Sequence, residues 1–113
     1  MDTIRTYLTA RIGQEMFAIE VAHVSNIIEY TKNITKLPEM PVSILGIINL
    51  RGHVLPVIDL RIQLGIKNKE ITDHTCILVT EIEIESEKVI MGMLVDEVNE
   101  VMRMLEELKK KKS

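Results

Sequence analysis

The 113-residue sequence contains no tryptophan, one phenylalanine and two tyrosines. Surfaces that bind single-stranded nucleic acid stack bases on aromatic side chains, so such a surface is not expected here. The formal net charge of −3 points the same way, because nucleic-acid-binding domains carry a basic patch. Basic residues cluster only at positions 109–112, which we interpret as a solvated lysine-rich tail spanning residues 109–113.

Cysteine is equally scarce. Cys76 is the single cysteine, so no intrachain disulfide can form, and its apolar neighbours predict a small buried side chain in a protein of a reducing compartment. No stretch of about 18 uncharged apolar residues is present, and the first residues lack the apolar run of a signal peptide. We therefore expect a cytoplasmic protein without direct membrane insertion.

Catalytic and metal-binding patterns are also missing. His23, His53 and His74 are isolated in the sequence, and no phosphate-binding glycine loop, zinc-protease helix motif or cysteine pair at zinc-ligand spacing occurs. Because catalysis needs a positioned set of groups, we predict no enzyme activity, no catalytic residues, no metal and no cofactor.

What the sequence does contain is a core. Apolar residues make up 46% and charged residues 27%, which is typical of a globular domain, and the length fits one domain over residues 1–113. Residues 7–12 and 16–19 are short apolar stretches flanking Gly13, as in a β-hairpin. Residues 75–84 are the longest strand candidate, and residues 85–88 are expected to turn the chain into a second strand over 89–95.

A further hairpin is predicted over residues 49–60. Its apolar runs flank a turn in which Gly52 can supply a positive φ. Pro56 lacks an N–H and should place the second run at a sheet edge or a bulge, while Ile58 is expected in the core. Asp59 is placed to cap a short helix that ends near Leu64.

Two segments are ambiguous. Apolar residues at positions 21, 24, 27 and 28 fit one face of a short helix from about residue 20 to 26. Residues 98–108 have helical spacing, yet residues 98–104 would serve equally as a strand. We favour a short strand followed by a terminal helix.

The run over residues 46–61, GIINLRGHVLPVIDLR, closely resembles the signature of the CheW family of bacterial chemotaxis adaptors. Residues 92–98, GMLVDEV, resemble a second family strand, and the similarity extends over about residues 6–104. The resemblance implies a mainly β fold of two small SH3-like five-stranded barrels that share a hydrophobic core, with short helices.

The resemblance also implies a non-catalytic scaffold that couples chemoreceptors to the histidine kinase CheA. A groove between the barrels would take the receptor's cytoplasmic tip, and a barrel end would pair with the regulatory domain of the kinase. Carried over residue by residue, Val24 and Ile27 would line the receptor groove and Arg51 would lie beside it.

This sequence departs from the family pattern in two ways. Many members have a glutamate that pairs with the motif arginine, whereas this chain has Asn26, with Glu29 as a substitute partner for Arg51. Typical members also continue past the equivalent of Met104 with strands that complete the first barrel, so one barrel is expected to be incomplete. An open barrel edge favours a homodimer. It also leaves the alternative of a truncated accessory or competitor subunit that retains one binding interface.

Overall fold

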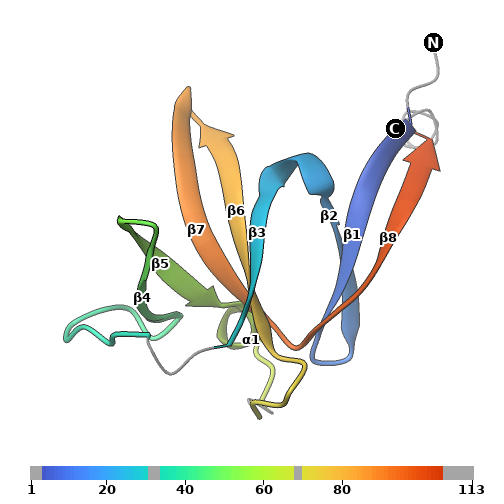
Figure 1. Ribbon diagram of the computed structural model, residues 1–113. Helices are drawn as coiled ribbons and strands as arrows, with labels where there is room; N and C mark the ends of the chain where they lie inside the picture. Colours follow the sequence, from blue (N-terminus) through green and yellow to red (C-terminus); the bar gives the residue numbers. More distant parts are fainter. Residues whose placement is uncertain (1–3, 31–33, 68–69, 106–113) are drawn as a thin grey trace.

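The structure is a computed structural model that describes residues 4–30, 34–67 and 70–105. Within these residues eight strands form two sheets, a three-stranded sheet of order β2-β1-β8 and a five-stranded sheet of order β3-β6-β7-β5-β4. The two sheets diverge from a common base and open toward the top of Figure 1. The elements are β1 (Ile4–Ile12), β2 (Glu15–Glu20), η1 (Val21–His23), β3 (Val24–Glu29), β4 (Ile44–Leu50), β5 (His53–Asp59), α1 (Leu60–Gln63), β6 (Cys76–Ile84), β7 (Glu87–Val95) and β8 (Glu97–Leu105).

The predicted fold class is confirmed. The described chain is mainly β, and its two curled sheets are half-barrels joined at the base. The three hairpins expected from sequence are present as the antiparallel pairs β1–β2, β4–β5 and β6–β7. α1 is the short helix predicted after Asp59, whose side chain accepts a hydrogen bond from the backbone N–H of Arg61 at 3.0 Å.

Among the described residues, β6 contributes side chains to both hydrophobic clusters. Its residues from Cys76 to Thr80 are buried on both faces, as in a strand with packed layers on either side. Successive side chains point to opposite faces, so Cys76 and Leu78 join the first cluster and Ile77 and Val79 join the second. The first cluster, which lies between the two sheets, consists of Leu8, Ala10, Ile12, Cys76, Leu78 and Val95. The second consists of Ile48, Leu55, Val57, Ile77, Val79 and Leu94.

The prediction of a helix over residues 20–26 is wrong. One 3-10 turn, η1, spans Val21–His23, and the chain then enters strand β3, which pairs with β6. A helix of about two turns is marginal on its own, whereas β3 gains a ladder of backbone hydrogen bonds along a buried strand. Over a segment as short as residues 21–28, the spacing of the apolar residues fits the period of a strand as well as that of a helix.

The C-terminal ambiguity is resolved as strand for residues 97–105. β8 pairs with β1 from Ile4↔Leu105 to Arg11↔Glu97, with a bulge opposite Thr9. The Thr9 hydroxyl donates to the Glu100 carbonyl and accepts from the Glu100 N–H, at 3.0 and 3.1 Å. The terminal helix and the lysine tail lie outside the described residues.

Two expectations for β5 need correction. Of the two alternatives for Pro56, the edge is wrong, because β5 lies between β7 and β4. A register shift does occur in the β4–β5 ladder, on β4 opposite Val57 and Ile58. The pairing of β5 with β7 begins at Val57, so Pro56 lies outside that ladder and its missing N–H breaks no bond there. Ile58 is only half-buried, because the inward-facing positions of β5 are Leu55, Val57 and Asp59.

The helices among the described residues are all too short to span a membrane.

Burial raises the pKa of the Cys76 thiol. The thiolate is the reactive form, so Cys76 is expected to react with a thiol reagent at pH 8 far more slowly in the native protein than in denaturant. The free energy of unfolding should also fall as the pH rises above about 8.5, where the unfolded thiol ionises and the folded thiol does not. Comparing the pH dependence of unfolding in the wild type and Cys76→Ala checks this. Identical slopes in the two proteins would contradict it.

Candidate functional site: a two-part hollow astride β3

An apolar hollow of about 400 Å³ lies where β3 faces the three-stranded sheet. η1 and β3 form one wall with Val21, Val24 and Ile27, and β1 and β8 form the other with Leu8 and Val101. Ile27 is 51% exposed and Val101 is 60% exposed, so both apolar side chains are available to a partner. Val24 is half-buried and also packs on the first cluster. Val24 and Ile27 therefore line one hollow, and their part in receptor binding stays a prediction.

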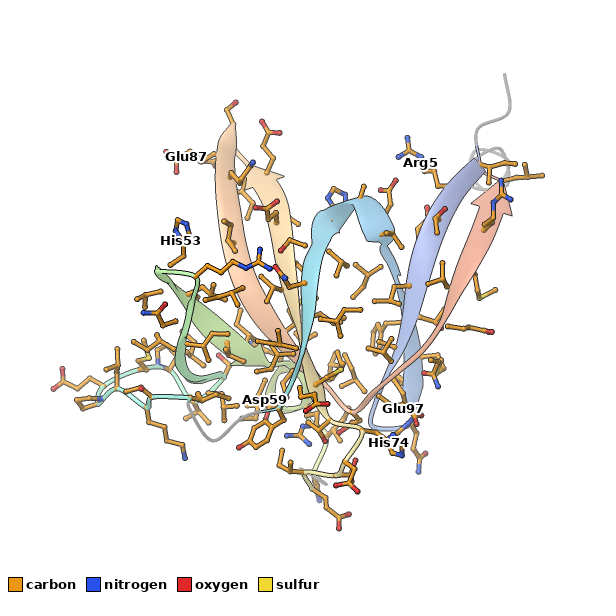
Figure 2. All side chains as sticks on the ribbon, in the orientation of Figure 1. Arg5, His53, Asp59, His74, Glu87 and Glu97 are labelled. Carbon is orange, nitrogen blue, oxygen red and sulfur yellow. The ribbon has the colours of Figure 1, made fainter. Side chains whose placement is uncertain are left out.

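A second hollow of about 350 Å³ adjoins it and shares the Ser25 and Asn26 positions of β3. Its lining combines the polar side chains of Arg51, His53 and Glu81 with apolar ones, Leu50, Leu55, Val79 and Ile90. Figure 2 shows His53 at the end of the β4–β5 hairpin that borders this region. The two hollows therefore place apolar and charged groups on either side of one edge strand.

Arg51 is held in an unfavourable backbone conformation. The hairpin pair Leu50↔His53 leaves a two-residue turn, with φ of 52° at Arg51 and 84° at Gly52. Asn49 Oδ1 accepts a hydrogen bond from the Gly52 N–H at 3.0 Å, which fixes the turn. Positive φ at both positions is typical of hairpin turns that carry Asn and Gly. Arginine is less stable than Asn or Gly in this conformation, so Arg51 does not stabilise the turn. Among the residues that the structure describes, its guanidinium has no hydrogen bond or ion pair.

The two partners expected for Arg51 are placed differently. Asn26 lines the same hollow as Arg51, although no hydrogen bond joins them within the described chain. Glu29 lies three residues further along β3, opposite Cys76, and lines a separate hollow with Tyr30 and residues 71–73 and 75. The structure therefore brings Asn26 near the motif arginine and does not bring Glu29 there.

The histidines do not form a catalytic chain in the part of the structure that is described. His23 Nε2 lies 3.4 Å from Glu20 Oε2, and His74 Nδ1 lies 3.9 Å from Glu97 Oε2 at the base of the sheets (Figure 2). His53 shares its hollow with Arg51 and Glu81 without a hydrogen bond to either. The described residues also contain no group of three His, Cys, Asp or Glu side chains placed to hold a metal ion.

A buried ionic cluster lies at the base of the two sheets. Arg61 is 2% exposed, and its guanidinium forks onto Asp59, with Nε to Oδ1 at 3.1 Å and Nη2 to Oδ2 at 3.2 Å. Its Nη1 donates to Asp96 Oδ1 at 3.2 Å and to the Glu70 carbonyl at 3.1 Å. Burial alone would lower the pKa of Arg61, but the hydrogen bonds and charges of Asp59 and Asp96 outweigh it and raise the pKa, so the guanidinium stays charged.

The sequence predicts Asp59 as a helix cap, but it does not predict an ionic cluster of Asp59, Arg61 and Asp96. Asp59 and Arg61 lie in the run over 46–61, and Asp96 lies in the run over 92–98. A signal was present, since an arginine two residues after an apolar strand and an aspartate that ends another are both unusual beside core positions. The ion pair between Arg61 and Asp96 forms only in the folded structure, so the periodicity of a local sequence pattern cannot predict it.

Comparisons with known proteins all point to one family. Residues 6–111 match the CheW-like domain family. A probable chemotaxis protein CheW of Rhizobium etli is 35% identical over 104 residues, which are 92% of this chain and 64% of that protein. The chemotaxis protein CheW of Bacillus subtilis is 43% identical over 89 residues, or 79% of this chain and 53% of that protein.

The structural comparison gives the same result. The crystal structure of the scaffolding protein TtCheW from Thermoanaerobacter tengcongensis has a TM-score of 0.80 and 32% identity, and the match covers 93% of this chain and 68% of that one. This chain spans 64% and 53% of the lengths of the two curated relatives. With the family match, the sequence relatives and the fold in agreement, the chain belongs to the CheW-like domain family.

Proposed function

We propose that this chain is a non-catalytic, cytoplasmic chemotaxis scaffold that couples chemoreceptors to the histidine kinase CheA. The observation that carries the proposal is the two-part hollow astride β3. Exposed Ile27 and Val101 line its apolar part, and Arg51, which has no partner in the described chain, lines the adjoining part. A helical receptor tip that lays an apolar face on the first hollow can offer a carboxylate to Arg51 in the second.

The proposed receptor site consists of Val24, Ile27 and Arg51, with Asn26 in the same hollow as Arg51. Titration of a soluble receptor fragment that carries the helical-hairpin tip, followed by NMR, is expected to perturb residues on both sides of β3. Ile27→Asp should abolish these perturbations, because it puts a charge at the apolar contact. Ile84→Asp is the matched control, since Ile84 is 49% exposed but lies on the β6–β7 hairpin away from both hollows. Equal binding by the two variants would exclude the β3 site.

Replacing Arg51 separates turn stability from binding. Asn tolerates the left-handed conformation better than Arg does, so Arg51→Asn is expected to leave the free energy of unfolding unchanged or raise it by up to about 1 kcal/mol. The same variant should weaken receptor binding, because loss of a charge-assisted hydrogen bond removes about 1.5–3 kcal/mol. Chemical denaturation and calorimetric titration measure the two effects. Receptor affinity equal to the wild type would remove Arg51 from the site.

We also propose a second copy of the chain as a partner. β8 has β1 as its single neighbour in the described residues, and its exposed apolar side chains are Val101, Met102, Met104 and Leu105. A long apolar edge strand is a template for pairing with another chain. Light scattering at tens of micromolar should therefore show a dimer, a range in which weak association is visible. Met102→Lys should restore the monomer, and a monomeric wild type under these conditions would contradict the proposal.

A second candidate function is favoured by the same open sheet. A sheet in which, among the described residues, β8 pairs only with β1 suits an accessory or competitor subunit that keeps one of the two interfaces. Such a protein would bind receptor or kinase without joining them. Adding the chain to receptor and kinase in the presence of a full-length coupling protein separates the two roles, because a competitor lowers kinase activity and a scaffold does not.

A further inference from the structure

Asp96 lies at the point where the chain crosses between the sheets. β7 of the five-stranded sheet ends at Val95, and β8 of the three-stranded sheet begins at Glu97. The Asp96 N–H donates to the Arg11 carbonyl at 2.9 Å, and Asp96 Oδ2 accepts from the Gly13 N–H at 2.6 Å. Both partners belong to the β1–β2 hairpin. The crossover is therefore fixed to the three-stranded sheet by two short hydrogen bonds.

Arg61 holds the same carboxylate from the other side. Asp59 ends β5 of the five-stranded sheet, its N–H donates to the Ser43 carbonyl at 2.8 Å, and its two carboxylate oxygens bind the Arg61 guanidinium. The guanidinium then reaches Asp96 at 3.2 Å. Figure 2 shows Asp59 near the base, where the two sheets meet. One planar cation thus joins the carboxylate that ends β5 of the five-stranded sheet to the carboxylate of the crossover, which is itself hydrogen-bonded to the β1–β2 hairpin.

The two walls of the apolar hollow, η1 and β3 on one side and β1 and β8 on the other, extend upward from this base. The first cluster runs between the sheets from Ile12 and Val95, next to the ionic cluster, to Leu8, which also lines the apolar hollow against Val24. Leu8 lies four residues from Ile12, about 13 Å along a strand, so a tilt of about 5° at the base moves Leu8 by about 1 Å. Packed interiors transmit such a displacement because they are nearly incompressible.

We propose that Arg61 is a positioning residue that sets the separation between the two walls of the apolar hollow. It is far from any partner docked at β3 and acts through the angle between the sheets; the consequence for binding rests on the proposed receptor function. Lysine cannot replace it, because a point ammonium lacks the planar fork that holds both oxygens of Asp59 and one of Asp96 together.

The test measures wall separation directly. Spin labels at Glu83→Cys on β6 and Arg103→Cys on β8, both exposed positions, report the distance between the sheets by pulsed electron paramagnetic resonance. The labelled chain is diluted in unlabelled chain, so that only distances within one copy are recorded. All proteins carry Cys76→Ala so that only the labelled sites react. Arg61→Lys and Asp96→Asn are both expected to shift or broaden the distance distribution. Asp96→Asn provides the second route if Arg61→Lys fails to fold, because its amide oxygen can still accept from Gly13.

The matched control is Val57→Ala, which destabilises the second cluster on the opposite face of β6 without touching the ionic cluster. Its distance distribution should equal that of the parent protein. Receptor-tip affinity should fall about 2- to 30-fold in the Arg61 and Asp96 variants, the range seen when coupling residues are changed at a distance. Unchanged distributions in folded variants would overturn the proposal. A changed distribution with unchanged affinity would uphold the positioning role and contradict the receptor site instead.

Discussion

Arg61→Met is expected to lower the free energy of unfolding by about 3–5 kcal/mol, the effect of removing one partner from a buried ion pair. The guanidinium donates hydrogen bonds to the carboxylates of both Asp59 and Asp96, at 3.1–3.2 Å. Without it, two carboxylates that are 2% and 9% exposed have no compensating cation within the described structure. For a domain of this size, a loss of that magnitude is a large fraction of the total stability.

Urea denaturation followed by circular dichroism measures this loss. Arg103→Met is the matched control, because Arg103 is exposed on β8 and should change stability by less than about 0.5 kcal/mol. The triple variant Arg61→Met, Asp59→Asn, Asp96→Asn should recover part of the loss, since its buried groups are neutral. A single Arg61→Met variant as stable as the wild type would show that the ionic cluster does not hold the fold together.

Leu78→Ala is expected to lower the free energy of unfolding by about 2–5 kcal/mol, through lost burial and the cavity left behind. Leu78 is fully buried in the first cluster, in the middle of the strand that both clusters share. Pairing with β3 on one side and β7 on the other leaves the backbone little room to close the cavity. The expected size therefore lies in the upper part of the range for leucine truncations.

The same strand offers the control. Ile84→Ala removes a comparable side chain on the same face of β6, but Ile84 is 49% exposed near the β6–β7 turn. It should change stability by less than about 1 kcal/mol, because little burial is lost. Equal losses in Leu78→Ala and Ile84→Ala would contradict the division of β6 into a buried half and an exposed half.

Much of the fold was predictable where local chemistry has one solution. The β4–β5 hairpin follows from two apolar runs around Gly52, and α1 follows from a capping aspartate between a strand and Gly65. The long β6 strand was recognisable because its first half is apolar at every position and its second half alternates. These signals are contained within about ten residues each, the range over which sequence patterns are informative.

The errors and omissions arise from contacts made across the sequence. The apolar residues of 21–28 fit a helix, and the pairing with β6 that makes them a strand lies some fifty residues away. Ile58 and Val57 are equally apolar, and the pairing of β5 with its neighbours decides which of them faces the core. The site was predicted in the same uneven way. Val24, Ile27 and Arg51 do line the two hollows, whereas Val101 and the Arg61 cluster required the packing of β8 and the β7–β8 crossover.

Reconstitution of kinase activity tests the central claim most directly. Membranes that carry a chemoreceptor are combined with CheA and with this chain, as wild type or as Ile27→Asp, and phosphate transfer to the kinase is measured over a range of chain concentrations. The wild type is expected to activate the kinase strongly and Ile27→Asp not at all, with Ile84→Asp behaving as the wild type. Activation by Ile27→Asp equal to that of the wild type would contradict a coupling site at β3.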